Sequence, residues 1–280
     1  MNRTMNKITR FLIASFLFLS SCKKQEFDIV NLNDNKITAL GHAGMGIAST
    51  YPMDSYESIL SCLNLHMDGS EFDVQMTKDS VLVAFHDLEL SDKTNLKGTI
   101  NSMNWSDVKN GHYNITPYLT NYSIISLEQL FSNIDNIKKY KFTFDCKLYT
   151  NDNDINRFYE RYMNEVIKII QKHDIEDNVY IESQSREFLS LFKSKKPAYR
   201  LFIYPSSFEE GLEIASSLHL YGITISTRNI TKEQIKTAHD NGLLVAVWNT
   251  HTENDNIEAI NKNPDFIQTD KVKGLLKLLK

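Results

Sequence analysis

Short apolar runs alternate along the chain with longer segments in which apolar positions recur every three or four residues. The runs have the length of strands, and the spacing between them is typical of helices that pack on a sheet. The predicted strands are 37–42, 69–74, 81–86, 141–147, 179–183, 199–204, 221–226, 243–248 and 265–269. The predicted helices include 155–171, 185–193, 208–218, 231–241 and 253–261. Thr231, three residues before Gln234, is one helix start signal.

Alternating strands and helices predict a parallel sheet, and about eight such units in about 250 residues predict a closed α/β barrel of the TIM (β/α)8 type. Strands 69–74 and 81–86 depart from this pattern, because the residues between them are too few for a parallel crossover. They must therefore form a β-hairpin that turns near Lys78. The hairpin brings His86 back beside Glu71 and Asp73, so that these three side chains share one site.

The N-terminal segment differs from the rest of the chain. Residues 1–10 carry three basic side chains and no acidic one, and residues 11–19 form a short apolar run. This pattern is typical of a signal peptide, and the run is too short to span a membrane as a helix. Leu-Ser-Ser then precedes Cys22 in the pattern of a bacterial lipobox.

We therefore expect three parts: a signal peptide over 1–21, a lipidated N-terminus and polar tether over 22–36, and one barrel domain over 37–280. The lipid on Cys22 would anchor the exported protein to a bacterial membrane, on its periplasmic or cell-surface side. The sequence leaves open which membrane that is, and it gives no oligomeric state.

Removal of the signal peptide takes away three basic residues and lowers the formal net charge from −4 to −7. Such a surface does not suit nucleic acid. Cys62, in an expected helix, and Cys146, in an expected strand, could form one disulfide or none in an exported chain. We expect none, because cysteines in such positions are most often buried apolar fillers.

Charged side chains recur with strand spacing on two of the predicted strands. Glu71 and Asp73 lie two residues apart and so point to the same face, as do Asp145 and Lys147. Neighbouring carboxylates repel unless a cation lies between them, and oxygen ligands at the end of a barrel strand favour a divalent ion. Lys147 would place a positive charge in the same cavity, suited to a phosphate oxygen. The alternative is that these charges face solvent or form ion pairs.

Two histidines lie at the ends of predicted strands. His42 opens the loop His-Ala-Gly-Met-Gly, and His86 ends the apolar run Val-Leu-Val-Ala-Phe. A lone histidine at a strand end is more often structural, but two beside a metal site can divide the general acid and general base work.

The motifs together resemble the glycerophosphodiester phosphodiesterases, a family of phosphatidylinositol-phospholipase-C-like barrels, over nearly the whole mature chain. Residues 69–87, GSEFDVQMTKDSVLVAFHD, are similar to that family's Glu-x-Asp strand, Thr-Lys-Asp turn and His-Asp strand end. Asp145-Cys146-Lys147 is similar to its Glu-x-Lys. The segments LLVAVWNTHT and DFIQTDKV resemble its Trp-bearing strand and its closing segment.

The resemblance implies metal-dependent hydrolysis of glycerophosphodiesters to glycerol phosphate and an alcohol. It implies His42 and His86 as the catalytic histidines, Glu71, Asp73 and Asp145 as ligands of one Mg²⁺ or Ca²⁺ ion, and Lys147 and Trp248 as substrate contacts.

The chain departs from the family pattern at three places. Ala43 stands where the family usually has an arginine that contacts the phosphate, Met53-Asp54 replaces Glu-Asn, and Asp145 is one methylene shorter than the usual Glu. These differences leave two alternatives: a phosphodiesterase for another lipid-derived head group, or an impaired binding lipoprotein of the same fold.

A long segment after the second barrel strand, residues 91–126, cannot be assigned from its pattern. It carries Trp105, Tyr113, Tyr118 and Tyr122. We expect either a lid over the site or a packed insertion.

Overall fold

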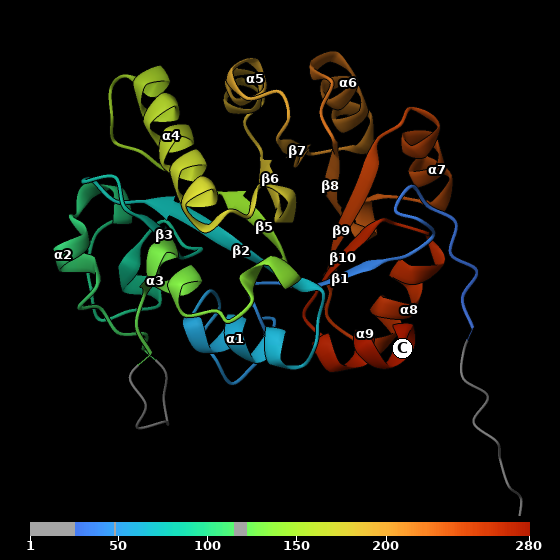
Figure 1. The fold of residues 1–280 in the computed structure, drawn as a ribbon, viewed down its shortest axis with the longest axis horizontal. Coiled ribbons are helices and arrows are strands. Elements are labelled where there is room, and N and C mark those ends of the chain that lie inside the picture. The colour runs from blue at the N-terminus through green and yellow to red at the C-terminus, as the bar shows by residue number, and fades with distance from the viewer. Residues whose placement is uncertain (1–25, 48, 115–121) are drawn as a thin grey trace, which may run out of the picture.

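Eight parallel strands close into a barrel with helices on its outside (Figure 1), within residues 26–47, 49–114 and 122–280, which the computed structural model describes. The strand order is β1-β10-β9-β8-β7-β6-β5-β2, and β1 pairs with β2 to close the ring. The barrel strands are β1 (Thr38–Gly41), β2 (Gly69–Met76), β5 (Lys141–Cys146), β6 (Val179–Ser183), β7 (Arg200–Ile203), β8 (Gly222–Ser226), β9 (Leu244–Thr250) and β10 (Phe266–Thr269). The predicted TIM barrel is confirmed.

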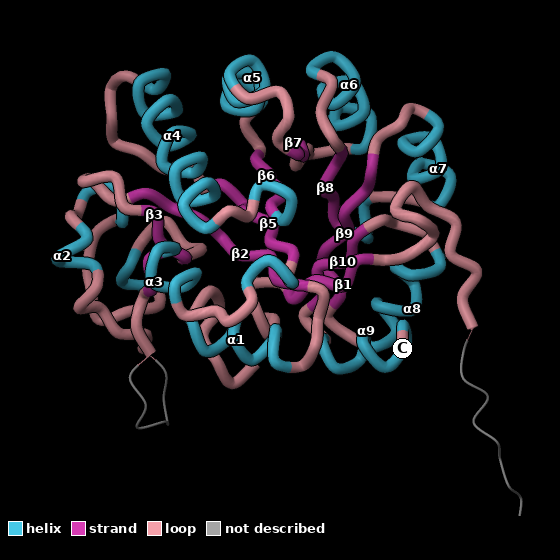
Figure 2. The backbone as a smooth tube through the Cα atoms, in the orientation of Figure 1, coloured by secondary structure: helices cyan, strands magenta, loops and turns pink. Residues whose placement is uncertain are grey.

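Helices follow the barrel strands and cover their outer face (Figure 2). They are α1 (Tyr56–Asn64), α4 (Ile155–His173), α5 (Arg186–Lys195), α6 (Phe208–Leu218), α7 (Lys232–Asp240), α8 (Glu253–Asn261) and α9 (Val272–Leu279). The predicted start signal of α7 is present as a capping box between Thr231 and Gln234. The last helix, α9, was not anticipated from the pattern.

The predicted hairpin is also confirmed. Strand β3 (Leu82–Ala84) pairs antiparallel with β2, and the backbone N–H of Phe85 donates to the carbonyl of Asp73 at 3.0 Å. The chain thus runs back alongside β2 to the level of Asp73, which places His86 next to that residue.

The segment that follows is an insertion with a small apolar core of its own. It contains α2 (Trp105–Val108) and β4 (Ile125–Ser126), and leads into α3 (Leu127–Ser132). Its core consists of Val83, Phe85, Leu90, Ile100, Val108 and Ile124. Trp105 and Tyr113 pack against this core, so the segment is a packed insertion over its described part, whereas Tyr118 lies outside the described residues.

The barrel interior changes from apolar to polar along its axis. At the end where the strands begin, Leu40, Tyr180, Phe202, Ala246 and Phe266 form one buried cluster. Nearer the strand ends, buried Glu182 accepts hydrogen bonds from Thr224 Oγ1 at 2.6 Å and Gln268 Nε2 at 3.1 Å. The part of the barrel interior nearer the carboxyl ends of the strands is therefore lined by polar side chains.

The predicted signal peptide and Cys22 lie outside the described residues. Part of the predicted tether packs on the barrel, since Asn31 Nδ2 donates to the carbonyl of Pro264 and Leu32 N–H donates to Asp265 Oδ1. Within the described part of the chain, no helix has the length and apolar character needed to cross a membrane. Cys62, in α1, and Cys146, in β5, are both buried with free thiols.

Candidate active site

His42 immediately follows β1 and is held from two sides. Its backbone N–H donates to the carbonyl of Thr269, and its Nδ1 lies 2.9 Å from Oδ1 of Asp270, which directly follows β10. An ionised carboxylate only accepts hydrogen bonds, so Nδ1 carries the hydrogen. The other ring nitrogen, Nε2, then faces the neighbouring carboxylates and lies 4.0 Å from Oε2 of Glu71.

Three carboxylates gather beside this histidine. Glu71 and Asp73 extend from β2 and Asp145 from β5, with Asp73 and Asp145 directly paired in the register of the two strands. One oxygen of each lies within 4.8 Å of the others, so the group could hold a metal ion. Oδ2 of Asp73 is buried and has no hydrogen-bond partner among the described residues. A buried, all-oxygen donor set with one unpartnered oxygen fits Mg²⁺ or Ca²⁺.

The electrostatics of this carboxylate group show mutual repulsion. Burial, followed by the charges of Asp73, Glu182 and Asp145, raises the pKa of Glu71 well above its usual value. Burial and the Asp73 charge likewise raise the pKa of Asp145, although Lys147 opposes them. A cation between the three groups would remove this repulsion.

Lys147 supplies one positive charge to the group. Its Nζ lies 2.5 Å from Asp145 Oδ2 and 3.0 Å from Asp73 Oδ1. Burial raises the pKa of Asp73, but the charge of Lys147 and then those of the two histidines outweigh it and lower that pKa. Burial lowers the pKa of Lys147, but the charges of Asp73 and Asp145 outweigh it and raise that pKa, so the ammonium stays charged beside the cluster.

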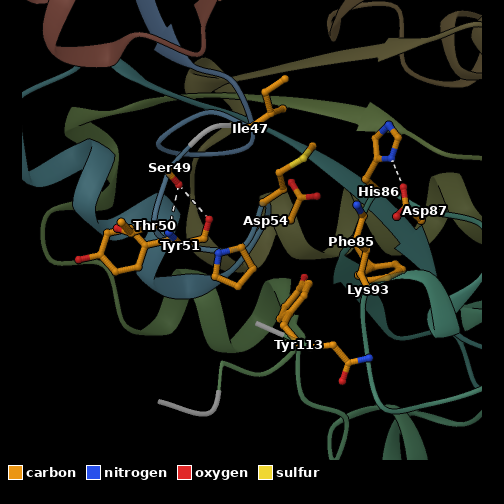
Figure 3. A pocket seen from close by; sticks show the side chains of 13 residues that line it. Ile47, Ser49, Thr50, Tyr51, Asp54, Phe85, His86, Asp87, Lys93 and Tyr113 are labelled. Carbon is orange, nitrogen blue, oxygen red and sulfur yellow. Dashed lines mark hydrogen bonds and ion pairs between the residues drawn. The ribbon is translucent and has the colours of Figure 1, made fainter. Parts of the chain in front are cut away.

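His86 approaches the cluster from the insertion side. Its Nδ1 lies 2.6 Å from Oδ1 of Asp87 (Figure 3), which leaves Nε2 free. Buried Gln75 clamps this segment, because its Nε2 donates to the carbonyls of Phe85 and Asp87 at 2.8 Å. Both candidate histidines thus pair Nδ1 with an aspartate and keep Nε2 for chemistry.

The loop after His42 is shaped by backbone contacts around Ala43. This buried residue adopts φ +48°, and its N–H donates to Oε2 of Glu71 at 2.9 Å. Its carbonyl accepts from Ser58 Oγ and from the backbone N–H of Asp54. Next to it, Gly44 has φ +87°, and a Cβ there would lie 2.5 Å from Ser58 Oγ. The loop therefore orients Glu71 through a backbone N–H, and the alanine side chain supplies no phosphate contact.

Trp248, predicted as a substrate contact, lies beside the ring of His42. The two ring centroids are 6.1 Å apart, and Tyr204 packs edge-on against the indole at 5.6 Å. The indole Nε1 is buried without a hydrogen-bond partner among the described residues. Burial and the charge of Asp145 raise the pKa of Tyr204 to about 12, so its hydroxyl stays protonated.

The structure therefore brings together the seven residues that the sequence predicted for catalysis, metal binding and substrate contact. It also adds residues that sequence reasoning missed as site groups: Asp54, Asp270 and His251. His251 Nδ1 lies 2.5 Å from Oδ2 of Asp270, so that carboxylate joins two histidines. Asp270 directly follows β10 and His251 directly follows β9, as His42 follows β1, and a position at or just after the end of a barrel strand was the available signal.

Comparison with known proteins agrees with this geometry. Residues 45–274 match the model of the glycerophosphoryl diester phosphodiesterase family. The chain belongs to this family. It is accordingly an enzyme that hydrolyses phosphoric diesters.

A glycerophosphodiester phosphodiesterase of Bacillus altitudinis is 24% identical over 239 residues, which cover 81% of this chain and 93% of that protein. Among solved structures, a glycerophosphodiester phosphodiesterase from Parabacteroides distasonis has a TM-score of 0.73 at 19% identity, covering 87% of this chain and 97% of its own. An Oleispira antarctica phosphodiesterase, solved with its product sn-glycerol-3-phosphate, has a TM-score of 0.75 at 16% identity, covering 88% and 97%. At such identities the structural matches show the shared fold.

Proposed function

We propose that this enzyme hydrolyses glycerophosphodiesters to glycerol phosphate and an alcohol, with a divalent ion held by Glu71, Asp73 and Asp145. The observation that carries the proposal is the placement of two aspartate-paired histidines beside one buried group of three carboxylates. Family membership and the product seen in the Oleispira antarctica structure support the same reaction.

The protein side chains have separable roles in this mechanism. Nε2 of one histidine takes the proton of the nucleophile, and Nε2 of the other gives a proton to the leaving alkoxide. The nucleophile is either water or a hydroxyl of the substrate's glycerol, and in the second case water then opens the cyclic phosphate. The aspartates on the Nδ1 side hold each ring in the required tautomer. Lys147 contacts a phosphate oxygen as a point charge. A divalent ion held by Glu71, Asp73 and Asp145 would supply positive charge to the phosphate and would favour deprotonation of the nucleophile.

A direct test is the hydrolysis of glycerophosphoethanolamine, glycerophosphocholine and glycerophosphoglycerol with Mg²⁺, Ca²⁺ or EDTA present. The proposal expects release of glycerol phosphate that EDTA abolishes. Turnover that EDTA does not affect would contradict the metal role, and silence on all three substrates with either metal would favour another phosphodiester or a binding protein.

We further propose that the domain is tethered to a membrane through a lipid on Cys22. The support is the basic and apolar N-terminal pattern that ends in Leu-Ser-Ser-Cys. In the bacterium of origin, labelling with a fatty-acid analogue should mark the wild-type protein and not a Cys22→Ala variant. Equal labelling of both would contradict the anchor.

A further inference from the structure

Two cavities flank the carboxylate group at the open end of the barrel. The first, of about 520 Å³, lies between residues 49–54 and the insertion, and we call it the His86-side pocket. The second, of about 440 Å³, lies at the ends of β6 to β9 beside Trp248 and Tyr204, and we call it the Trp248-side pocket. Asp54 of the first pocket accepts from the backbone N–H of Asp73, and Trp248 of the second lies beside the His42 ring, so both pockets adjoin the candidate active site. A phosphodiester has two arms, one on each side of its phosphate.

The His86-side pocket contains two buried polar atoms that lack a partner among the described residues. They are Oδ2 of Asp54, whose residue is 1% exposed, and the hydroxyl oxygen of Tyr113. The other Asp54 oxygen accepts from the backbone N–H of Asp73, so that side chain is fixed in place. Figure 3 shows the Tyr113 hydroxyl directed toward the Asp54 side of the pocket. Unsatisfied groups of this kind are costly in a protein interior unless a ligand binds them.

The rest of the lining combines negative charge with aromatic surface. Asp87 adds a second carboxylate, while the rings of Tyr51, Phe85 and Tyr113 come from both walls. Phe85 and Tyr113 pack with ring centroids 5.9 Å apart. Lys93 also lines the pocket, but it is exposed and thus solvated. Carboxylates together with aromatic faces are the chemistry that recognises an ammonium group, including a quaternary one.

The Trp248-side pocket has a different character. Besides Trp248 and Tyr204, its lining includes the uncharged hydrogen-bonding side chains of Ser206, Ser226 and Asn229. The one carboxylate of the lining, Glu210, accepts from the backbone N–H of Ser206. Hydroxyl and amide groups beside an indole N–H suit a polyol.

We propose that the His86-side pocket binds the head-group alcohol of the substrate and selects alcohols that carry an ammonium group, while the Trp248-side pocket receives the glycerol arm. The inference rests on the proposed function and names its substrate class. It also places His86 beside the oxygen of the leaving alcohol. An ammonium group beside Asp54 would offset the repulsion between that carboxylate and Asp73.

Kinetics on two substrates test the selection. The ratio of kcat/KM for glycerophosphocholine to kcat/KM for glycerophosphoglycerol should fall about tenfold in Asp54→Asn, which keeps the oxygen that binds Asp73 N–H. Tyr113→Phe should lower the ratio in the same direction. Glu210→Gln, a matched loss of charge in the other pocket, should leave the ratio within about twofold. A ratio unchanged in both pocket variants, or a wild-type preference for the uncharged head group, would overturn the proposal.

A binding measurement separates this inference from the reaction itself. Choline titrated into the wild-type protein in a calorimeter should bind, with at least about tenfold weaker binding in Asp54→Asn. Choline binding without any phosphodiester turnover would keep the pocket assignment and contradict the proposed function. Turnover of all three glycerophosphodiesters without choline binding would support the proposed function and contradict the pocket assignment.

Discussion

His42 Nδ1 lies 2.9 Å from Oδ1 of Asp270, and the register of the closing strands accounts for this contact. Gly41 pairs with Thr269 at the ends of β1 and β10, so the next residue of each strand continues side by side. Burial lowers the pKa of His42, but the hydrogen bond and charge of Asp270 outweigh it and raise that pKa. Strand register therefore places the two residues side by side, and the charge of Asp270 raises the pKa of His42.

Replacement of Asp270 by Asn keeps a hydrogen-bond acceptor and removes the charge. The pKa of His42 should fall, so the limb of the pH profile of kcat/KM that belongs to His42 should move to lower pH, with at least about a tenfold loss of rate. His251→Gln, which leaves the Asp270 charge and its bond to His42, should not move that limb to lower pH. A D270N profile that coincides with the wild type would contradict the positioning role.

The same pair affects stability at acid pH. Burial raises the pKa of Asp270, but its bonds to His42 and Ile47 outweigh it and lower that pKa. Its ionic contribution is thus complete above the ordinary carboxyl pKa of about 4 and is lost as pH falls through the lowered value. The wild type should therefore lose more stability than D270N on acidification.

Metal binding should be visible without any substrate. The repulsion between the three carboxylates favours binding of a cation, and a ligand that binds only the folded state stabilises it. Mg²⁺ or Ca²⁺ at about 100 times its Kd should therefore stabilise the fold by about 2.7 kcal/mol. Thermal unfolding of the wild type should shift upward with the metal, and Glu71→Gln should lose most of that shift. Equal shifts in the two proteins would place the ion elsewhere.

Lys147 offers a test of the phosphate contact. Lys147→Met removes the ammonium that bonds Asp73 and Asp145, and kcat/KM should fall about 10²- to 10³-fold. Lys147→Arg keeps the charge with altered geometry and should retain more activity than the methionine variant. A Met variant within threefold of the wild type would exclude the contact.

Asp265 closes the opposite end of the barrel. Its buried carboxylate accepts from the backbone N–H groups of Leu32 and Val245 and pairs with His239. Asp265→Ala leaves these buried donors without an acceptor, which should cost about 3 kcal/mol of unfolding free energy in urea titrations. Lys236→Ala, which removes an exposed pair with Asp240, should cost about 0.5 kcal/mol or less.

The barrel could be predicted because its strands are continuous apolar runs. The hairpin could be predicted because the six residues 75–80 are too few to connect two parallel strands. That geometry alone placed His86 beside Asp73. By contrast, Asp270 meets His42 through closure of the ring between its first and last strands, a contact over more than two hundred residues that no local pattern encodes. His251 joins the site only through its bond to Asp270. The sequence marked Asp54 only as a departure from the family pattern. Its contact with the backbone N–H of Asp73 depends on the fold of the loop after His42, in which Ala43 adopts a positive φ.

The most direct test of the central claim is the turnover of glycerophosphocholine with saturating Mg²⁺ by the wild type, His42→Ala and His86→Ala. General acid and general base catalysis by these two residues predicts that each variant loses at least about 10²-fold in kcat while the folded state persists in thermal melts. Turnover within tenfold of the wild type in both folded variants would contradict the two-histidine mechanism.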